Sequence, residues 1–135
     1  MGRARIATQV HTNAGDADDV LVTPKKLRWG FSYSFGLNGY VVLPSWMAGL
    51  IFQWGQATLV MDDQSVPFPL AYPNVALNVQ TTCSGFVERI TGAAGLSKTG
   101  FAAEGFSMGG SSGAPGSNWV VANGNISIFW FSVGY

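Results

Sequence analysis

Two patterns of apolar and polar positions divide the chain. From about residue 37 onward, short apolar runs alternate with Gly, Pro, Asn and Asp, which is typical of β-strands joined by turns. Residues 75–81 alternate apolar and polar with a period of two. The pattern predicts further strands over 40–43, 50–54, 56–61, 66–70, 86–90, 100–103, 119–122 and 126–133, with a bulge or bend at Gly55. This series of short strands indicates an all-β fold, an antiparallel β-sandwich.

The last predicted strand is apolar on both faces. Phe129, Phe131 and Val133 share one face, whereas Ile128 and Trp130 share the other. A strand of this kind is central and covered on both sides. We therefore expect a neighbouring subunit to supply the second cover.

Turn residues predict how some strands are placed. Asn123-Gly124 is a strong signal for a type I′ hairpin and would pair the last two strands. Pro67 and Pro69 predict that their strand lies at a sheet edge, because proline lacks the N–H that a central strand donates. Asp62-Asp63-Gln64 reads as a turn.

The N-terminal part predicts helices instead. Residues 4–12 suit a short helix that ends at Asn13-Ala14-Gly15. Thr23 is a good N-cap for a second helix, with Pro24 at its first position and Gly30 near its end. We place a helical neck segment at residues 1–36 and a β-sandwich tip domain at residues 37–135.

Composition adds a reason to expect an oligomer. Only 10% of residues are charged, against about 25% in average domains, while 47% are hydrophobic. Eight of the fourteen charged residues lie in residues 1–28, which leaves the strand region almost uncharged. A small domain cannot bury this much apolar surface alone. The net charge of zero argues against a nucleic-acid partner, which requires a basic surface.

The sequence lacks signals for disulfide bonding, secretion and membrane insertion. Cys83 is the sole cysteine, so a disulfide within the chain is excluded and a free structural thiol is expected. The start of the chain lacks the apolar stretch of a signal peptide. No apolar run approaches the roughly 18 residues of a membrane-spanning helix, so no membrane insertion is expected.

Catalytic and metal-binding patterns are also missing from the sequence. His11 is the only histidine, which leaves no ligand set for zinc and no base for a serine triad. Asp62 and Asp63 are adjacent, and neighbouring strand residues point to opposite faces, so the pair cannot flank one glycosidic bond. We expect no catalytic residues, no metal, no cofactor and no enzymatic activity.

Several motifs resemble those of bacteriophage tail fibres. Residues 18–27 (DDVLVTPKKL) resemble the repeat found just before a fibre tip. Residues 38–44 (NGYVVLP) and 49–55 (GLIFQWG) resemble the start of a tail fibre C-terminal receptor-binding domain. Pro67-Phe68-Pro69 with Tyr72-Pro73-Asn74, and the final FWFSVGY, complete a likeness that covers most of the chain from about residue 18.

The resemblance implies a function and partners that composition does not. Such domains form homotrimers at the distal end of a fibre of a phage or of a phage-tail-like bacteriocin. They attach the particle to a surface glycan such as lipopolysaccharide, or to an outer-membrane protein, of the host bacterium. The rest of the fibre would precede this chain, and the virion component would be assembled in the host cytoplasm.

Candidate receptor contacts are aromatic and small polar residues near loops. Sugar rings pack on aromatic side chains, while amides and hydroxyls bond the sugar OH groups. We select the Gly/Ser-rich segment at 109–118 and its surroundings, together with two aromatic residues elsewhere; the candidates are Ser111, Ser112, Ser117, Asn118, Trp119, Trp46 and Tyr72. Trp54 and Trp130 are assigned to packing.

Two other functions stay open. The chain could be a structural trimer cap without receptor contact, in which case deletion of 110–117 would leave cell binding intact. It could also be a glycan-cleaving tailspike-type enzyme with carboxylates paired across subunits, which would release reducing ends from host polysaccharide.

Overall fold

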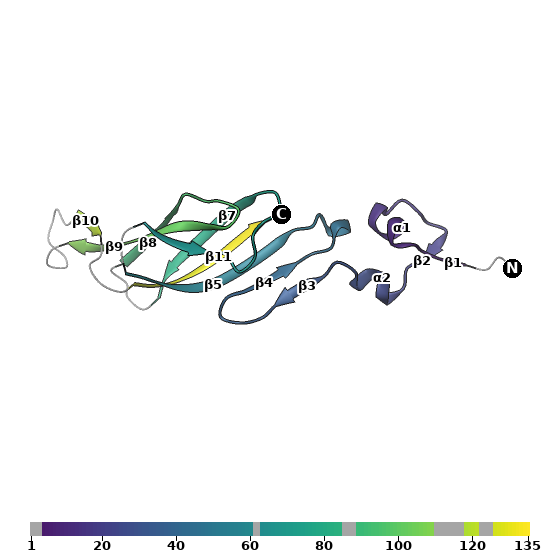
Figure 1. Cartoon of the computed structure of the whole chain (residues 1–135), viewed down its shortest axis with the longest axis horizontal. Helices are drawn as coiled ribbons and strands as arrows, with labels where there is room; N and C mark the ends of the chain where they lie inside the picture. The colour runs from purple at the N-terminus through teal and green to yellow at the C-terminus, as the bar shows by residue number, and fades with distance from the viewer. Residues whose placement is uncertain (1–3, 61–62, 85–88, 110–117, 122–125) are drawn as a thin grey trace.

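The chain forms an elongated, mostly β structure with the N-terminal part at one end (Figure 1). The structure is a computed structural model, and it describes residues 4–60, 63–84, 89–109, 118–121 and 126–135. For residues 107–109 and 118–121 it describes the backbone alone. Two antiparallel sheets face each other across one core, as predicted for an all-β sandwich.

The larger sheet has five strands in the order β3-β4-β5-β11-β7. Its members are β3 (Ser32–Ser34), β4 (Gly39–Val42), β5 (Ile51–Leu59), β7 (Ala76–Cys83) and β11 (Ile126–Gly134). The last strand is central, as predicted, because β11 pairs with β5 on one side and with β7 on the other. The β3–β4 pairing crosses the boundary that the sequence suggests after residue 36.

The smaller sheet is organised around one long strand, β9 (Gly100–Gly109). β8 (Arg89–Ala94) pairs with one edge of β9. β6 (Gln64–Pro67) and β10 (Asn118–Val121) pair with successive parts of the other edge. Within the described residues β6 has β9 as its single partner, so the prolines do mark an edge strand.

Two details of the predicted strands are wrong. β10 does not form a hairpin with β11 across Asn123-Gly124; it pairs with the end of β9, in the other sheet. The chain therefore changes sheets between these strands. Gly55 is not a bulge, because β5 keeps its register with β11 without interruption from Ile51 to Leu59. A glycine is needed there for another reason: a Cβ at this position would overlap the Trp130 indole and Asn38 Oδ1.

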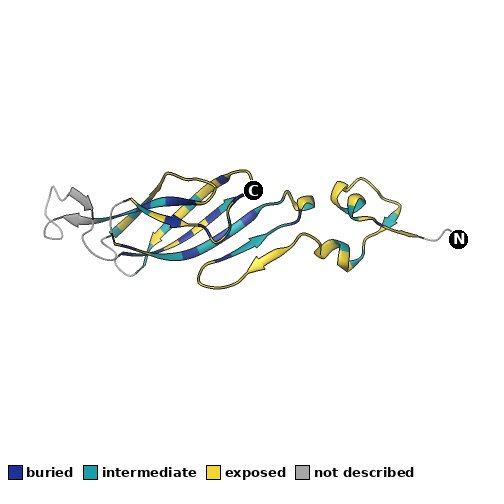
Figure 2. Cartoon of the chain, viewed as in Figure 1, coloured by how far each residue is buried: buried dark blue, intermediate teal, exposed yellow. Residues whose placement is uncertain are grey.

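The core lies between the two sheets and is rich in aromatic rings. The Phe68 ring packs 5.6 Å from Trp130, and Phe101 lies 5.8 Å from the same indole. Aliphatic side chains complete the cluster, among them Ile51, Leu59, Val66, Ile126 and Ile128. Figure 2 shows buried residues concentrated in the two sheets, whereas the N-terminal part is mostly exposed.

Gln53, the glutamine of the Gln-Trp-Gly motif, is buried within this core. Its Nε2 donates to Leu70 O at 2.8 Å, and its Oε1 accepts from Leu70 N at 2.9 Å. The side chain thus hydrogen-bonds the backbone of the segment after β6 as a neighbouring strand would. Each residue of the motif is structural, since Trp54 Nε1 donates to Gly36 O at 3.1 Å and Gly55 makes room for Trp130.

The N-terminal part contains short elements. β1 (Arg5–Ile6) pairs in parallel with β2 (Val20–Leu21), and α1 (Gln9–Ala14) connects them. The helix predicted over 4–12 is therefore shifted, because residues 5–6 extend to join β2. α2 (Pro24–Arg28) follows Thr23, as predicted. In the part of the chain that the structure describes, no helix has the length and apolar character required to cross a bilayer.

Candidate functional site

The outer face of the five-stranded sheet carries a group of aromatic side chains. Alternation along β11 points Ile128 and Trp130 into the core and leaves Phe129 and Phe131 49% and 46% exposed on the other face. Register places Trp54 opposite Phe131, and the Phe52 and Phe131 rings stack with centroids 6.2 Å apart. The face that the sequence predicts to be covered is thus uncovered in a single chain.

The aromatic group continues across the β3–β4 hairpin. The Phe35 ring stacks on Trp54 at 5.9 Å, and Tyr33 lies 5.0 Å from Phe35. Phe35 is 73% exposed. We call Tyr33, Phe35, Phe52, Trp54, Phe129 and Phe131 the outer aromatic face. Contiguous exposed apolar surface of this kind marks an interaction site rather than ordinary solvent-exposed surface.

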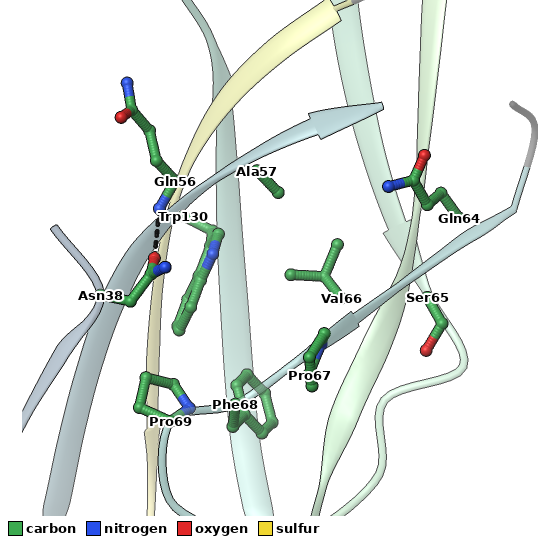
Figure 3. A pocket seen from close by; sticks show the side chains of 10 residues that line it. All are labelled: Asn38, Gln56, Ala57, Gln64, Ser65, Val66, Pro67, Phe68, Pro69 and Trp130. Carbon is green, nitrogen blue, oxygen red and sulfur yellow. Dashed lines mark hydrogen bonds between the residues drawn. The ribbon is translucent and has the colours of Figure 1, made fainter. Parts of the chain in front are cut away.

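A pocket opens on the inner side of the same sheet, between the edges of β5 and β6 (Figure 3). Its cavity of about 320 Å³ is lined by Asn38, Ala57, Val66, Phe68, Pro69 and Trp130, among others. We call it the Trp130 pocket. A second cavity of about 270 Å³ adjoins it and shares Asn38, Gln56 and Ala57. None of the described residues that line the two cavities carries a charge.

Trp130 contributes an unsatisfied donor to this pocket. Its indole is only 4% exposed, and Nε1 is buried without a hydrogen-bond partner among the described residues. Figure 3 shows this nitrogen on the ring edge that faces Ala57 and Val66, toward the space that the labelled side chains enclose. A buried donor left unpaired costs about 1–3 kcal/mol.

The side-chain amides around the pocket differ in how many of their hydrogen-bonding atoms already have a protein partner. Asn38 Oδ1 accepts from Gln56 N at 2.8 Å, and its Nδ2 is without a protein partner in the described ranges. Figure 3 shows Nδ2 on the side of Asn38 that faces the indole. Gln64 is fully engaged, because Oε1 accepts from Val60 N at 2.7 Å and Nε2 donates to Thr58 O at 3.0 Å. The pocket therefore presents the Trp130 and Asn38 N–H groups beside apolar side chains, and the Gln56 amide and Ser65 hydroxyl also line it.

The residues selected from sequence lie in three separate places. Ser111, Ser112 and Ser117 lie outside the described residues. Asn118 and Trp119 begin β10, where their backbones pair with the end of β9; their side chains are not described. This end of the molecule is opposite the N-terminal part (Figure 1).

The two selected aromatic residues have packing roles in this chain. Trp46 is half-buried in the 3₁₀ helix η1 (Ser45–Met47), which lies beside α1, and its ring meets Phe31 edge-on at 6.4 Å. Tyr72 is a core residue with 2% of its surface exposed, so its ring offers no surface to a receptor. Its hydroxyl donates to Ser132 Oγ at 2.9 Å. Sequence reasoning missed the Trp130 pocket, because no local motif joins residues 38, 57, 66 and 130.

Among the described residues, two titratable groups have shifted pKa values. Burial raises the pKa of Tyr72, and hydrogen bonds to Ser132 and Gln53 oppose the shift. Burial likewise raises the pKa of the Cys83 thiol. A hydrogen bond to Thr91 and the positive charge of Arg89 lower it by less. A raised pKa lowers the fraction of reactive thiolate, which agrees with a structural thiol. Across the described part of the chain, His, Cys, Asp and Glu side chains form no cluster of three or more that could hold a metal ion.

Comparisons with known proteins agree on tail fibres of phages and pyocins. Residues 43–135 match a family described as tail fiber protein gp53-like, C-terminal. No curated protein sequence matches the chain. The fold is similar to three solved pyocin fibre structures. These are an N-truncated R2-type pyocin tail fibre (TM-score 0.58, 20% identity), a C-terminal part of the Pseudomonas aeruginosa R2 fibre (0.59, 20%) and one of its R1 fibre (0.56, 21%).

The coverage of these matches is uneven. They cover 84%, 86% and 84% of this chain but 43%, 30% and 32% of the fibre chains, so this chain spans less than half of each. At such identities the likeness concerns the fold.

Proposed function

This chain belongs to the gp53-like tail fibre C-terminal family and is thus a component of a tail fibre, and we propose that it is the distal tip that attaches a phage or phage-tail-like particle to its host bacterium. The receptor is a surface glycan such as lipopolysaccharide. The tip acts outside the target cell after assembly in the host cytoplasm, and it binds without cleaving.

The observation that carries this proposal is the outer aromatic face. Phe129 and Phe131 lie on the central strand of the main sheet and are nearly half exposed, although the chain has few charged residues to keep such a surface solvated. Burial of apolar surface contributes roughly 25 cal/mol per Å². Three copies of the chain that cover these faces against one another supply the interface that one copy lacks. The exposed face supports self-association, and the resemblance to fibre tips implies that the assembly is a homotrimer.

A trimer has a functional advantage for attachment. Glycan contacts are weak individually, and three linked sites raise the overall affinity by 10²–10⁴-fold when all can engage. The N-terminal part and the β9–β10 end lie at opposite ends of the molecule (Figure 1). In the proposed orientation the N-terminal end continues into the fibre, and the β9–β10 end points toward the cell.

Cell binding tests the proposal directly. Fluorescently labelled chain is mixed with a panel of bacteria and with isogenic strains that lack their outer polysaccharide. We expect saturable binding to a subset of strains and its loss when the polysaccharide is missing. Absence of binding throughout the panel would contradict the attachment function.

The same assay separates the alternatives. A structural cap without receptor contact would not bind cells as an isolated chain. A variant lacking 110–117 should remain a trimer; loss of its attachment would place the receptor contact at the β9–β10 end, whereas retained attachment would place the contact elsewhere on the chain. Incubation with purified polysaccharide should release no reducing ends. Their release would favour a tailspike-type enzyme.

A further inference from the structure

We propose that the Trp130 pocket is a binding site for one uncharged sugar residue, held through oxygen acceptors on the sugar. The inference rests on the proposed attachment function and gives it a location that neither the sequence motifs nor the β9–β10 end suggested. Three properties of the pocket carry it: unpaired donors, an uncharged lining and a suitable size.

The donors come first. Trp130 Nε1 is buried and unpaired, and Asn38 offers Nδ2 from the neighbouring wall. Indole nitrogen is a donor only, and Asn38 already uses its acceptor oxygen on Gln56 N. These two groups therefore require acceptors on the ligand, whereas the Gln56 amide and Ser65 hydroxyl in the lining can donate or accept. Hydroxyl and ring oxygens of a sugar, or the carbonyl of an acetamido group, meet this requirement.

The rest of the lining selects against ions. Among the residues that the structure describes, the pocket has no Lys, Arg or His to balance a carboxylate or phosphate, and no Asp or Glu to balance an amine. Transfer of an unpaired charge into such a site is costly, whereas an uncharged polar group needs only its hydrogen bonds. Apolar side chains of Val66, Phe68 and Pro69 also line the pocket and suit the C–H surface of a sugar ring.

Size and position agree with a single ring. Ligand pockets span about 300–1,000 Å³, so 320 Å³ lies at the lower limit. The adjoining cavity beside Leu37 and Ser127 shares a wall with the pocket. It provides a place for the next residue of a glycan chain.

The test follows the Trp130 indole N–H by ¹H–¹⁵N NMR of the whole chain, with the resonance assigned through its sequence neighbours. The probes are methyl glycosides: uncharged hexosides, deoxyhexosides and N-acetylhexosaminides, and the anionic glucuronide. Concentrations extend about tenfold above a Kd of about 1 mM, the range of weak specific sites. We expect at least one uncharged glycoside to shift the Trp130 resonance saturably, with the glucuronide inactive.

Asn38→Asp is the decisive variant. It keeps the oxygen that accepts from Gln56 N and removes the Nδ2 donor. Asn78→Asp is its matched control, because Asn78 is an exposed asparagine on β7 whose Oδ1 also accepts a hydrogen bond, from Gln80. We expect Asn38→Asp to weaken glycoside binding about tenfold and Asn78→Asp to leave it unchanged.

The outcomes separate this inference from the proposed function. If no uncharged glycoside shifts Trp130, or if Asn38→Asp binds as tightly as the unchanged chain, the pocket is not the site. If only the glucuronide binds, the class of sugar is wrong. Either result leaves the attachment function standing when the unchanged chain still binds bacteria, whereas loss of all cell binding overturns that function by itself.

Discussion

Gln53 and Leu70 form a two-way hydrogen bond in which a side-chain amide pairs with a backbone N–H and C=O, at 2.9 and 2.8 Å. Gln53→Ala breaks both hydrogen bonds and leaves a void in the core. The backbone N–H and C=O of Leu70 then have no partner from this side chain. We expect a loss of roughly 2–4 kcal/mol in the free energy of unfolding. Urea unfolding measures it.

Gln80→Ala is the matched control for Gln53. Gln80 is an exposed glutamine on β7, and among the described residues its side chain bonds the Asn78 side chain alone. Its truncation should change stability by no more than about 0.5 kcal/mol. Equal effects of the two substitutions would show that the Gln53–Leu70 hydrogen bonds add no measurable free energy of unfolding.

Gly55→Ala tests the contact between β5 and the Trp130 indole. An added methyl group would overlap Trp130 and Asn38, so one of them must move. Overpacking of this kind costs about 1–3 kcal/mol. Gly92→Ala is the control, since its Cβ would lie 4.0 Å from the nearest Phe106 atom. Thermal unfolding should show a lower Tm for Gly55→Ala alone; an unchanged Tm would contradict the tight contact.

Phe131→Lys tests the outer aromatic face as the subunit interface. Light scattering after size exclusion should give about 43 kDa for the unchanged chain, three times the 14.3 kDa of one copy. A lysine on the central strand would bury three charges in the trimer, so we expect a monomer with an intact far-UV circular dichroism spectrum.

Leu96→Lys provides the comparison for this substitution. Leu96 is an exposed leucine between β8 and β9 and lies away from the main sheet's outer face. This variant should remain a trimer. A trimer of Phe131→Lys would place the subunit contact elsewhere on the chain.

Tyr72 predicts a loss of stability at alkaline pH. Because burial raises the pKa of Tyr72 above its ordinary value of about 10, the folded chain keeps a proton that the unfolded chain releases. The free energy of unfolding is unaffected below that ordinary value and falls as pH rises through the raised one.

Tyr72→Phe removes this titration and leaves the other groups in place. Unfolding curves from pH 8 upward should therefore decline less steeply for the variant than for the unchanged chain. Parallel declines would show that the hydroxyl of Tyr72 does not carry the effect.

Local patterns predicted the strands better than their pairing. The alternation in residues 126–133 identified a strand with two apolar faces, and the structure places it at the centre of the main sheet. Asn123-Gly124 predicted a hairpin that does not form, because the turn signal is local and the competing pairing of β10 with β9 is not. The sequence predicts a bulge or bend at Gly55 because it does not reveal that Trp130 packs against this position.

The pocket could not have been predicted for a similar reason. Trp130 was assigned to packing, and it does pack against Phe68 and Phe101. Its nitrogen has no hydrogen-bond partner among the described residues, and the side chains of the pocket come from segments far apart in the sequence. Loop composition drew attention to 109–118, whereas the unpaired donor results from contacts between distant segments.

β9 has a consequence for how such fibres diversify. Its first half is anchored by Phe101, Ala103 and Gly105, which are buried, while β10 pairs only with residues 106–109. Substitutions and length changes beyond Gly105 therefore leave the anchored half untouched. Under the proposed attachment function, we expect exchange of this outer end to change host range, and a foreign segment grafted between β9 and β10 to retarget the fibre.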